Sequence, residues 1–214
     1  GFDAFHGRSL MERLMSIDYP STLLSVQRRM HPEIAQIANS LYYDNKLQSD
    51  YKPSILVMKH LKQMESYNNI YKNPVNIIDI PDGCESSVGN GTINNIEAER
   101  ITNDVVICCK LANKIDWKPH IIIISPYQAQ CTLLRTMLQA QQCENVAVHT
   151  IDSFQGQEAD IVFLSTVRTN KSMGFWKDGR RLCVALTRAR HRMFIYGHLE
   201  SWKNSPTDLA KIHN

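Results

Sequence analysis

Residues 120–127 read HIIIISPY, and this stretch decides the fold. The four isoleucines Ile121–Ile124 form a short, continuous apolar run that a proline closes. Such a run is typical of a strand that is buried on both faces of a sheet. Apolar runs of comparable length occur at 75–80, 146–151, 159–167 and 192–197. The sequence therefore predicts several strands of one buried sheet.

Segments with a helical spacing of apolar residues separate these strands. They lie at 94–114, 128–141 and 178–190. Strands that alternate with helices favour a parallel sheet with helices over both faces. The fold class that follows is α/β, with a mostly parallel central sheet and helices on both faces.

Two polar stretches interrupt this alternation. Residues 50–74 and 81–95 are rich in polar side chains and are punctuated by prolines and glycines. We interpret the first stretch as an irregular excursion and the second as a surface loop, so that residues 50–95 are the least regular part of the chain.

Composition and charge exclude some classes of protein. Hydrophobic residues make up 43% and charged residues 21% of the 214 residues, which is ordinary for a globular domain. The longest apolar run is far shorter than the ~20 residues that cross a bilayer, so we expect no membrane partner. The net charge of +3 is compatible with a polyanionic partner and does not require one.

The six cysteines include no C-x-x-C pair. The spacing of a zinc knuckle is therefore absent from the sequence, and we expect no metal site in this chain. Several of the cysteines lie inside apolar patterns, where a free thiol behaves as a small hydrophobic group. A reducing compartment, cytoplasm or nucleus, is the expected location.

Three stretches carry residues suited to chemistry. In LTRAR (186–190), Arg188 can neutralise a γ-phosphate or lie solvated on the surface. QRRMHP (27–32) suits a helix N-terminus, with proline near its start. In DSFQGQE (152–158), Gly156 allows close backbone approach to a ligand and Glu158 can accept hydrogen bonds from a ribose, or the stretch is a tight connection. Taken one at a time, the stretches leave these alternatives open.

A phosphate-binding loop of the form G-x-x-x-x-G-K-[ST] is absent from the sequence. Ligands of parallel sheets bind beyond the carboxyl ends of the strands, so the polar residues near those ends are the expected place for a site. The stretches concerned are SPYQAQ (125–130), TIDSFQGQE (150–158), TVRTNKS (166–172) and, before the last strand, RRLCVALTRAR (180–190).

Taken together and in order, four stretches resemble the C-terminal motifs of superfamily 1B helicases, the group of the nonsense-mediated-decay helicase and senataxin. They are residues 23–47, 121–130, 146–168 and 174–197. The resemblance implies the second RecA-like domain of such an enzyme, a three-layer α/β domain. It implies that residues 1–20 trail from an upstream RecA-like domain, that 21–200 form the second domain, and that 201–214 form a C-terminal helix or tail.

The resemblance also implies roles in nucleotide binding. Arg188 matches the family's arginine finger, and Arg29 matches the second arginine that contacts the γ-phosphate. Gln27 and Arg28 match positions near the nucleotide. Glu158 matches the carboxylate that contacts the ribose, and Gly156 allows the close approach of the backbone.

A second set of residues matches the face that grips the nucleic-acid backbone. Its members are Ser125, Tyr127, Gln130, Thr150 and Ser153. Hydroxyl and amide groups of this kind contact phosphate and sugar, and so read little sequence.

Two positions depart from the family pattern. Arg28 stands where the family has a tyrosine near the adenine, so we expect weak discrimination between ATP and GTP. Cys183 stands in RRLCVALTRAR where the family has an asparagine, which leaves the support of the arginine finger in question.

The function implied is the C-terminal motor domain of an ATP-dependent helicase or translocase. ATP and Mg²⁺ would be held mainly by the upstream domain of the same polypeptide, and single-stranded RNA or DNA would be the second partner. The chain alone is expected to be a monomer without activity. The competing hypothesis is a catalytically silent module that binds RNA or serves as a scaffold.

Overall fold

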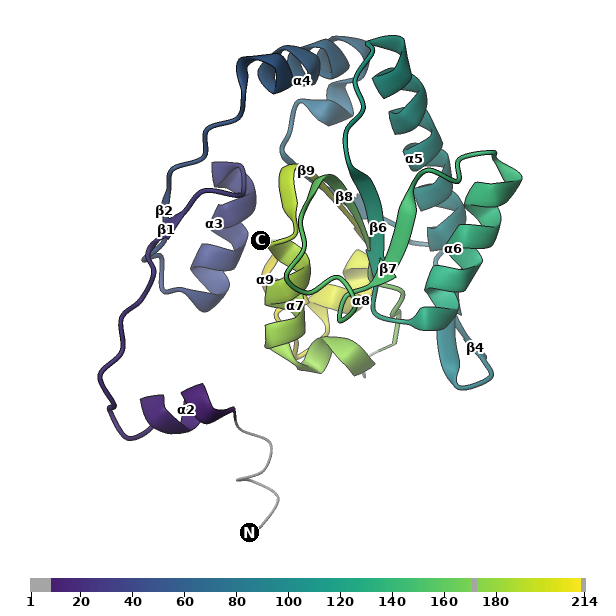
Figure 1. The fold of residues 1–214 in the computed structure, drawn as a ribbon. Helices are drawn as coiled ribbons and strands as arrows, with labels where there is room; N and C mark the ends of the chain where they lie inside the picture. Colours follow the sequence, from purple (N-terminus) through teal and green to yellow (C-terminus); the bar gives the residue numbers. More distant parts are fainter. Residues whose placement is uncertain (1–8, 171–172, 213–214) are drawn as a thin grey trace.

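The computed structural model describes residues 9–170 and 173–212 (Figure 1). Its centre is a five-stranded sheet in which every neighbouring pair of strands is parallel. The strand order is β3 (Val75–Asp79), β9 (Ala189–Gly197), β8 (Ala159–Ser165), β6 (Ile121–Ser125) and β7 (Ala147–Thr150). The sheet predicted from the apolar runs is thereby confirmed.

The isoleucine run shows why this sheet is buried on both faces. Ile121 and Ile123 belong to one apolar core, whereas Ile122 and Ile124 belong to the other. All four side chains are buried, because alternate residues of a strand point to opposite faces. The domain is therefore a three-layer structure with a separate core on each side of the sheet.

Helices form the two outer layers (Figure 1). The first core packs under α4 (Ile55–Tyr67), α5 (Asn95–Lys114) and α6 (Gln128–Ala140). The second core packs under α3 (Pro32–Tyr42), the short 3₁₀ helix η2 (Gly174–Lys177), α7 (Gly179–Leu186), α8 (Leu199–Lys203) and α9 (Leu209–Ile212). The prediction of helices on both faces is confirmed.

Residues 50–74 are more regular than the sequence suggested. They contain α4, whose first turn is capped by the Ser54 side chain, and the 3₁₀ helix η1 (Asn69–Tyr71). Only Leu61 and Met64 of α4 are buried, whereas Ile55 and Leu56 are exposed. The interpretation as an irregular excursion is wrong because so narrow a buried stripe leaves a weak periodic signal.

The predicted surface loop at 81–95 is also wrong, because it contains a β-hairpin. Strands β4 (Glu85–Val88) and β5 (Gly91–Asn94) pair antiparallel. A Cβ at Gly91 would lie 2.6 Å from that of Ala129, so the glycine allows the hairpin to pack directly on α6.

Two further boundaries differ from expectation, and one strand pair is new. The helix predicted over 178–190 ends at Leu186, and β9 begins at Ala189 rather than at Arg192. Arg188 therefore lies in the short connection between the two elements. A two-residue parallel pair, β1 (Val26–Gln27) with β2 (Gln48–Ser49), was not predicted.

The N-terminal helix lies at the margin of the domain, where Glu12 ion-pairs with Arg180 of α7 at 3.5 Å. Helix α2 (Leu10–Met15) carries a capping box between Ser9 and Glu12 and has no buried residue. Figure 1 shows it away from the sheet, joined by an extended segment. The rest of the predicted trailing segment, residues 1–8, lies outside the described residues. No helix within 9–170 or 173–212 is long and apolar enough to cross a membrane.

Candidate functional site

The predicted nucleotide-binding residues come together at the amino ends of β8 and β9, here named the amino edge. Glu158 directly precedes β8 and Arg188 directly precedes β9, and the first residues of these parallel strands are register partners. The segment around Arg29 joins them because the backbone N–H of His31 donates to the Arg190 carbonyl at 2.8 Å. Three segments distant in sequence thus form one site.

Arg29 lies at the centre of this site. Its Nε donates to Glu158 Oε2 at 2.6 Å, and its Nη1 donates to the Thr187 carbonyl at 3.1 Å. Gln27 shapes the same turn: its Oε1 accepts from the backbone N–H groups of Arg29 and Met30 at 3.1 and 2.8 Å. The guanidinium of Arg29 is therefore fixed from both sides of the site.

Arg188 is held more tightly and is largely buried. Its guanidinium donates to the carbonyls of Val184 and Gln157 at 2.8 and 2.9 Å, and to Thr187 Oγ1 at 2.9 Å. Burial, and then repulsion by Arg29, lower the pKa of Arg188 from its ordinary value. Since arginine stays protonated in proteins, the result is two neighbouring cations whose repulsion an anion would relieve.

A hollow of about 350 Å³ opens beside the two arginines. It is lined by Leu24, Gln27, Arg28, Arg29, Met30, Tyr43, Leu47, Thr187 and Arg188. Its volume lies at the lower end of the range for small-molecule pockets. Leu24, Tyr43 and Thr187 lie within the motif stretches 23–47 and 174–197, but no role was predicted for them, because apolar side chains and backbone carbonyls do not mark a binding site.

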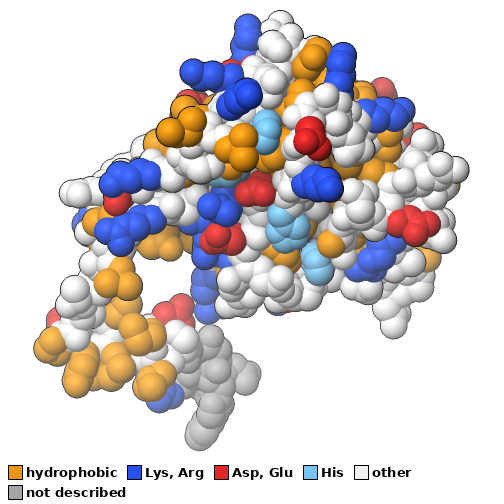
Figure 2. All heavy atoms as spheres, turned by 45° about the horizontal axis from the view of Figure 1, so that its top comes forward, with side chains coloured by type: hydrophobic (Ala, Val, Ile, Leu, Met, Phe, Trp, Pro, Cys, Tyr) orange, Lys and Arg blue, Asp and Glu red, His pale blue; other side chains and the backbone are white. Residues whose placement is uncertain are grey.

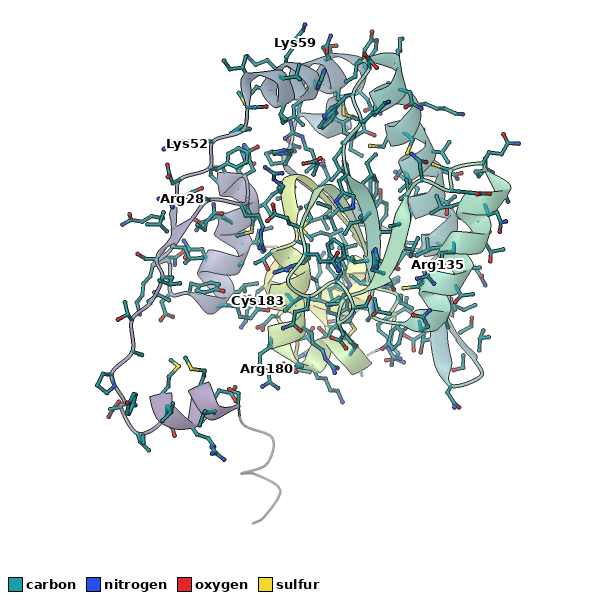
Figure 3. All side chains as sticks on the ribbon, in the orientation of Figure 1. Arg28, Lys52, Lys59, Arg135, Arg180 and Cys183 are labelled. Atoms are coloured by element: carbon teal, nitrogen blue, oxygen red, sulfur yellow. The ribbon has the colours of Figure 1, made fainter. Side chains whose placement is uncertain are left out.

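Arg28 and Cys183, the two residues that depart from the family pattern, are labelled in Figure 3. Arg28 lines the hollow, and Cys183 lies next to Tyr43, which also lines it. Arg28 is exposed, and its Nε lies 3.0 Å from Asp50 Oδ2. Cys183 lies on α7 next to Tyr43 and Arg188, and burial raises the pKa of its thiol. The partners that hold the Arg188 guanidinium are Val184, Gln157 and Thr187, so its support does not depend on the side chain at position 183.

Gly156 lies outside the contacts of the two arginines. It has φ +85°, and no atom lies within 4 Å of the position that a Cβ would take. The left-handed backbone turns the chain toward Glu158, and the space around it is open.

The residues predicted to grip nucleic acid lie at the opposite end of the sheet, the carboxyl edge. Ser125 and Thr150 are register partners at the ends of β6 and β7, and the Ser153 N–H donates to Thr150 Oγ1 at 3.2 Å. Tyr127 is half-buried, its ring edge-on to Phe175 and its hydroxyl 3.4 Å from the Phe175 N–H. Phe175 lies within the motif stretch 174–197, but no role was predicted for it.

Two of these residues point into the domain. Ser125 and Gln130 are fully buried, and Gln130 Nε2 donates to the Asn94 carbonyl and to Ser165 Oγ, each at 3.2 Å. Their side chains therefore do not suit a direct contact with a strand, whereas Tyr127, Thr150 and Ser153 have exposed surface.

The arginine cluster does not lie beyond the carboxyl ends of the strands, where the sequence led us to look for site residues. Arg29, Glu158 and Arg188 gather at the amino ends, because the 151–158 connection and α7 both carry the chain back across the sheet before the next strand begins. The two predicted sets of site residues are consequently separated by the length of the strands.

Figure 2 brings the upper part of Figure 1 forward. Lys and Arg side chains on this face are interspersed with acidic, apolar and histidine side chains, and do not form one continuous basic patch. Within residues 9–170 and 173–212, no group of three or more His, Cys, Asp or Glu side chains is placed to hold a metal ion.

Comparison with known proteins identifies the family. Residues 6–200 match the AAA_12 family model, described as an AAA domain. The chain is 34% identical over 210 residues to helicase SEN1 of Saccharomyces cerevisiae, covering 94% of this chain and 9% of that protein. It is 32% identical to the uncharacterized ATP-dependent helicase MJ0104 of Methanocaldococcus jannaschii, covering 89% and 29%. A third relative is regulator of nonsense transcripts 1 of Dictyostelium discoideum, 31% identical with 95% and 16% covered.

Among solved structures, one match is the C-terminal domain of a possible DNA helicase from Lactobacillus plantarum, with a TM-score of 0.42 and 16% identity. The matched region covers 75% of this chain and 91% of the solved chain. The chain spans less than a third of the length of the curated relatives above. The motifs, the parallel sheet and the family match agree: the chain belongs to the AAA_12 family and is a RecA-like C-terminal helicase domain of superfamily 1B.

Proposed function

We propose that this chain is the C-terminal motor domain of an ATP-dependent helicase or translocase that acts on single-stranded RNA or DNA. The observation that supports it best is the meeting of Arg29 and Arg188 beside a hollow of about 350 Å³. Two adjacent guanidiniums suit the γ-phosphate of a nucleotide held by an upstream RecA-like domain of the same polypeptide. A catalytically silent scaffold would have no need for this like-charged pair.

The residues present fit a nucleoside triphosphate. Arg188 is fixed by carbonyl and hydroxyl acceptors, so its charge is preorganised where charge develops on the transferred phosphoryl group. Arg29 would add a second cation, and Gln27 would keep its turn in place. Mg²⁺, when bound, neutralises phosphate charge, and we assign its ligands to the upstream domain.

Glu158 has two roles in this proposal. In the described conformation it accepts from Arg29 at 2.6 Å, so it orients that guanidinium. When a nucleotide binds beside the two arginines, Oε2 of Glu158 would keep Arg29 in place. Oε1, which lies 3.6 Å from Arg190 Nε in a long ion pair, would turn to the ribose hydroxyl groups. Arg28 would lie near the base, where its long exposed side chain gives weak selection between adenine and guanine.

The nucleic acid would cross the carboxyl edge. Tyr127, Thr150 and Ser153 have exposed surface there and offer hydroxyl groups to phosphate and sugar. Closure of the two RecA-like domains would bring both sites into use together, so nucleic acid should stimulate ATP turnover. We place this activity in the cytoplasm or nucleus, because the six cysteines carry free thiols.

The decisive experiment measures ATP hydrolysis by the full-length protein, stimulated by single-stranded nucleic acid, for wild type and Arg188→Ala. We expect turnover to fall by ~10³-fold, because an arginine finger contributes on that order. Binding of the single strand should be retained. Arg180→Ala is the matched control, since Arg180 lies on α7, the helix that leads to Arg188, but is exposed and pairs with Asp178.

Unchanged turnover in Arg188→Ala would contradict the arginine-finger assignment. Absence of ATP hydrolysis in the wild-type protein, with nucleic-acid binding intact, would instead favour the scaffold or RNA-binding module.

A further inference from the structure

The turn after β8 has an unusual backbone. Val167 follows the strand by two residues and has φ +69°. This left-handed conformation is strained for a β-branched residue, which adopts it only where the surroundings hold it in place. Val167 is fully buried, so both of its backbone polar groups need partners inside the protein.

Two residues at the start of α5 supply these partners. The Val167 N–H donates to both oxygens of the Glu97 carboxylate, at 3.0 and 3.2 Å. The Val167 carbonyl accepts from Asn94 Nδ2 at 3.2 Å. Ser165 Oγ, at the end of β8, donates to Glu97 Oε1 at 2.5 Å. The turn is thus held from both ends by one helix N-terminus.

Glu97 can accept from the Val167 N–H because Gln130, rather than Glu97, accepts from the N–H of the helix-capping residue Asn94. In an ordinary capping box, a glutamate at this position would accept from the N–H of the capping residue, which is Asn94. Here the Asn94 N–H donates to Gln130 Oε1 at 2.9 Å. Asn94, Glu97, Gln130, Ser165 and Val167 therefore form one buried set, which we name the Glu97 network.

Burying a carboxylate costs desolvation free energy, which a purely structural contact does not require. Glu97 is fully buried, and burial raises its pKa to about 7 in spite of the hydrogen bonds that favour the charged form. Ser165 and the backbone N–H groups of Thr166 and Val167, which face the carboxyl group, are all uncharged. An apolar side chain would suit the core better, but it would leave the Val167 N–H without an acceptor.

The turn leads directly to the surface of the carboxyl edge. Arg168 lies over the ring of Tyr127, 5.9 Å from its centroid, and ion-pairs with Glu85 at 3.3 Å. Trp176 Nε1 donates to the Thr166 carbonyl at 2.9 Å, which ties the turn to the segment that contains Phe175. The conformation at Val167 therefore fixes where the residues around Tyr127 lie.

We propose that Glu97 is a positioning residue for nucleic-acid engagement. By holding the N–H of Val167, it fixes the turn 166–168, whose Arg168 packs over the Tyr127 ring, in the shape that presents Tyr127 to the sugar–phosphate backbone. The strength with which a single strand stimulates ATP turnover then depends on a carboxylate that contacts neither ligand. This inference rests on the proposed function, since it concerns the same carboxyl edge.

The test uses the full-length protein and two probes, oligo(U) and oligo(dT). The quantities measured are unstimulated ATP turnover and the probe concentration that gives half-maximal stimulation. In Glu97→Ala we expect that concentration to rise about tenfold or more, because the hydrogen bonds that hold the Val167 N–H and the Ser165 hydroxyl are lost, while unstimulated turnover stays within about twofold. Glu97→Gln keeps one acceptor oxygen and should give an intermediate rise.

Val105→Ala is the matched control, because Val105 is buried on the same helix but does not contact the turn. It should lower stability without changing the half-stimulating concentration. If the Glu97 variants shift that concentration no more than Val105→Ala does, Glu97 is only a structural residue and the inference is wrong. Should Glu97→Ala fail to fold, Glu97→Gln decides by the same comparison.

Failure of the proposed function would look different. In that case Arg188→Ala would leave turnover unchanged, or the wild-type protein would show no stimulation by either probe, and the latter result would overturn the present inference as well.

Discussion

The amino edge and the carboxyl edge use polar groups in opposite ways. At the amino edge, the side chains of Arg29 and Glu158 are 31% and 42% exposed and pair with each other, and Arg29 also lines a hollow. At the carboxyl edge, Glu97, Gln130 and Ser165 are fully buried and satisfy one another. The first arrangement is ready to accept an external anion, whereas the second fixes the shape of a surface.

Strand β8 connects the two arrangements. Glu158 directly precedes it and the Val167 turn directly follows it, and its seven residues span about 23 Å at ~3.3 Å per residue. Because β8 is flanked by β6 and β9 and lies between both cores, a displacement at one end is not absorbed by loose packing. One rigid strand thus links the exposed, charged site at the amino edge to the buried Glu97 network at the carboxyl edge.

The largest expected effect is a pH dependence of the unfolding free energy that comes from the buried Glu97 at the carboxyl edge. The pKa of Glu97 is raised from 4.5 to about 7, so its contribution to stability is fully present below pH 4.5 and is lost as pH rises through 7. The shift corresponds to about 3 kcal/mol of unfolding free energy. We expect the Glu97→Gln variant to lack this pH-dependent contribution to the unfolding free energy.

The measurement is urea denaturation of the wild-type and Glu97→Gln chains at pH 5 and pH 8. Half-buried histidines such as His31 and His149, whose pKa values are lowered mainly by partial burial, change stability in the opposite sense in both proteins. The difference between the two proteins isolates Glu97. Equal pH dependence in both would show that Glu97 keeps an ordinary pKa and that the edges are less different than described.

A smaller effect is expected at the amino edge. Glu158→Gln weakens the 2.6 Å contact that orients Arg29, and stimulated ATP turnover of the full-length protein should fall about tenfold, less than for a fully buried pair because solvent screens it. Asp152→Asn, an exposed carboxylate in the same connection, is the control. A rise in the half-stimulating probe concentration, with turnover unchanged, would place Glu158 functionally with the carboxyl edge instead.

The smallest effect concerns the base of the nucleotide. Wild-type protein should hydrolyse ATP and GTP at rates within about threefold, because the exposed Arg28 guanidinium does not select between purines. Arg28→Tyr should favour ATP. A strict preference of the wild type for ATP would show that other residues of the hollow read the base.

The sequence predicted the strands well because each is a continuous apolar run buried on two faces, as Ile121–Ile124 illustrate. It failed for the hairpin because Glu85–Val88 is polar and largely exposed, and for α4 because two buried residues make a weak period. These elements depend on tertiary contacts, such as Gly91 against Ala129, that no local pattern records.

The site was predicted unevenly for a similar reason. The motifs brought Arg29, Glu158 and Arg188 together correctly, but the acceptors that hold Arg188 are mainly backbone carbonyls, which any residue supplies. Gln130 lies in a motif that resembles the nucleic-acid face, yet its side chain turns inward to Asn94 and Ser165. Position in a motif identifies the edge of the sheet on which a residue lies, but not the direction of its side chain.

Helix α4 and the β4–β5 hairpin lie outside the five-stranded sheet and both fall within residues 55–94. A change of length in either leaves the register of the central strands unaltered, since only β3 between them belongs to that sheet. Insertions and deletions during the divergence of such domains should therefore accumulate on both sides of β3. In an alignment of relatives, gaps would concentrate there while the four later strands stay aligned.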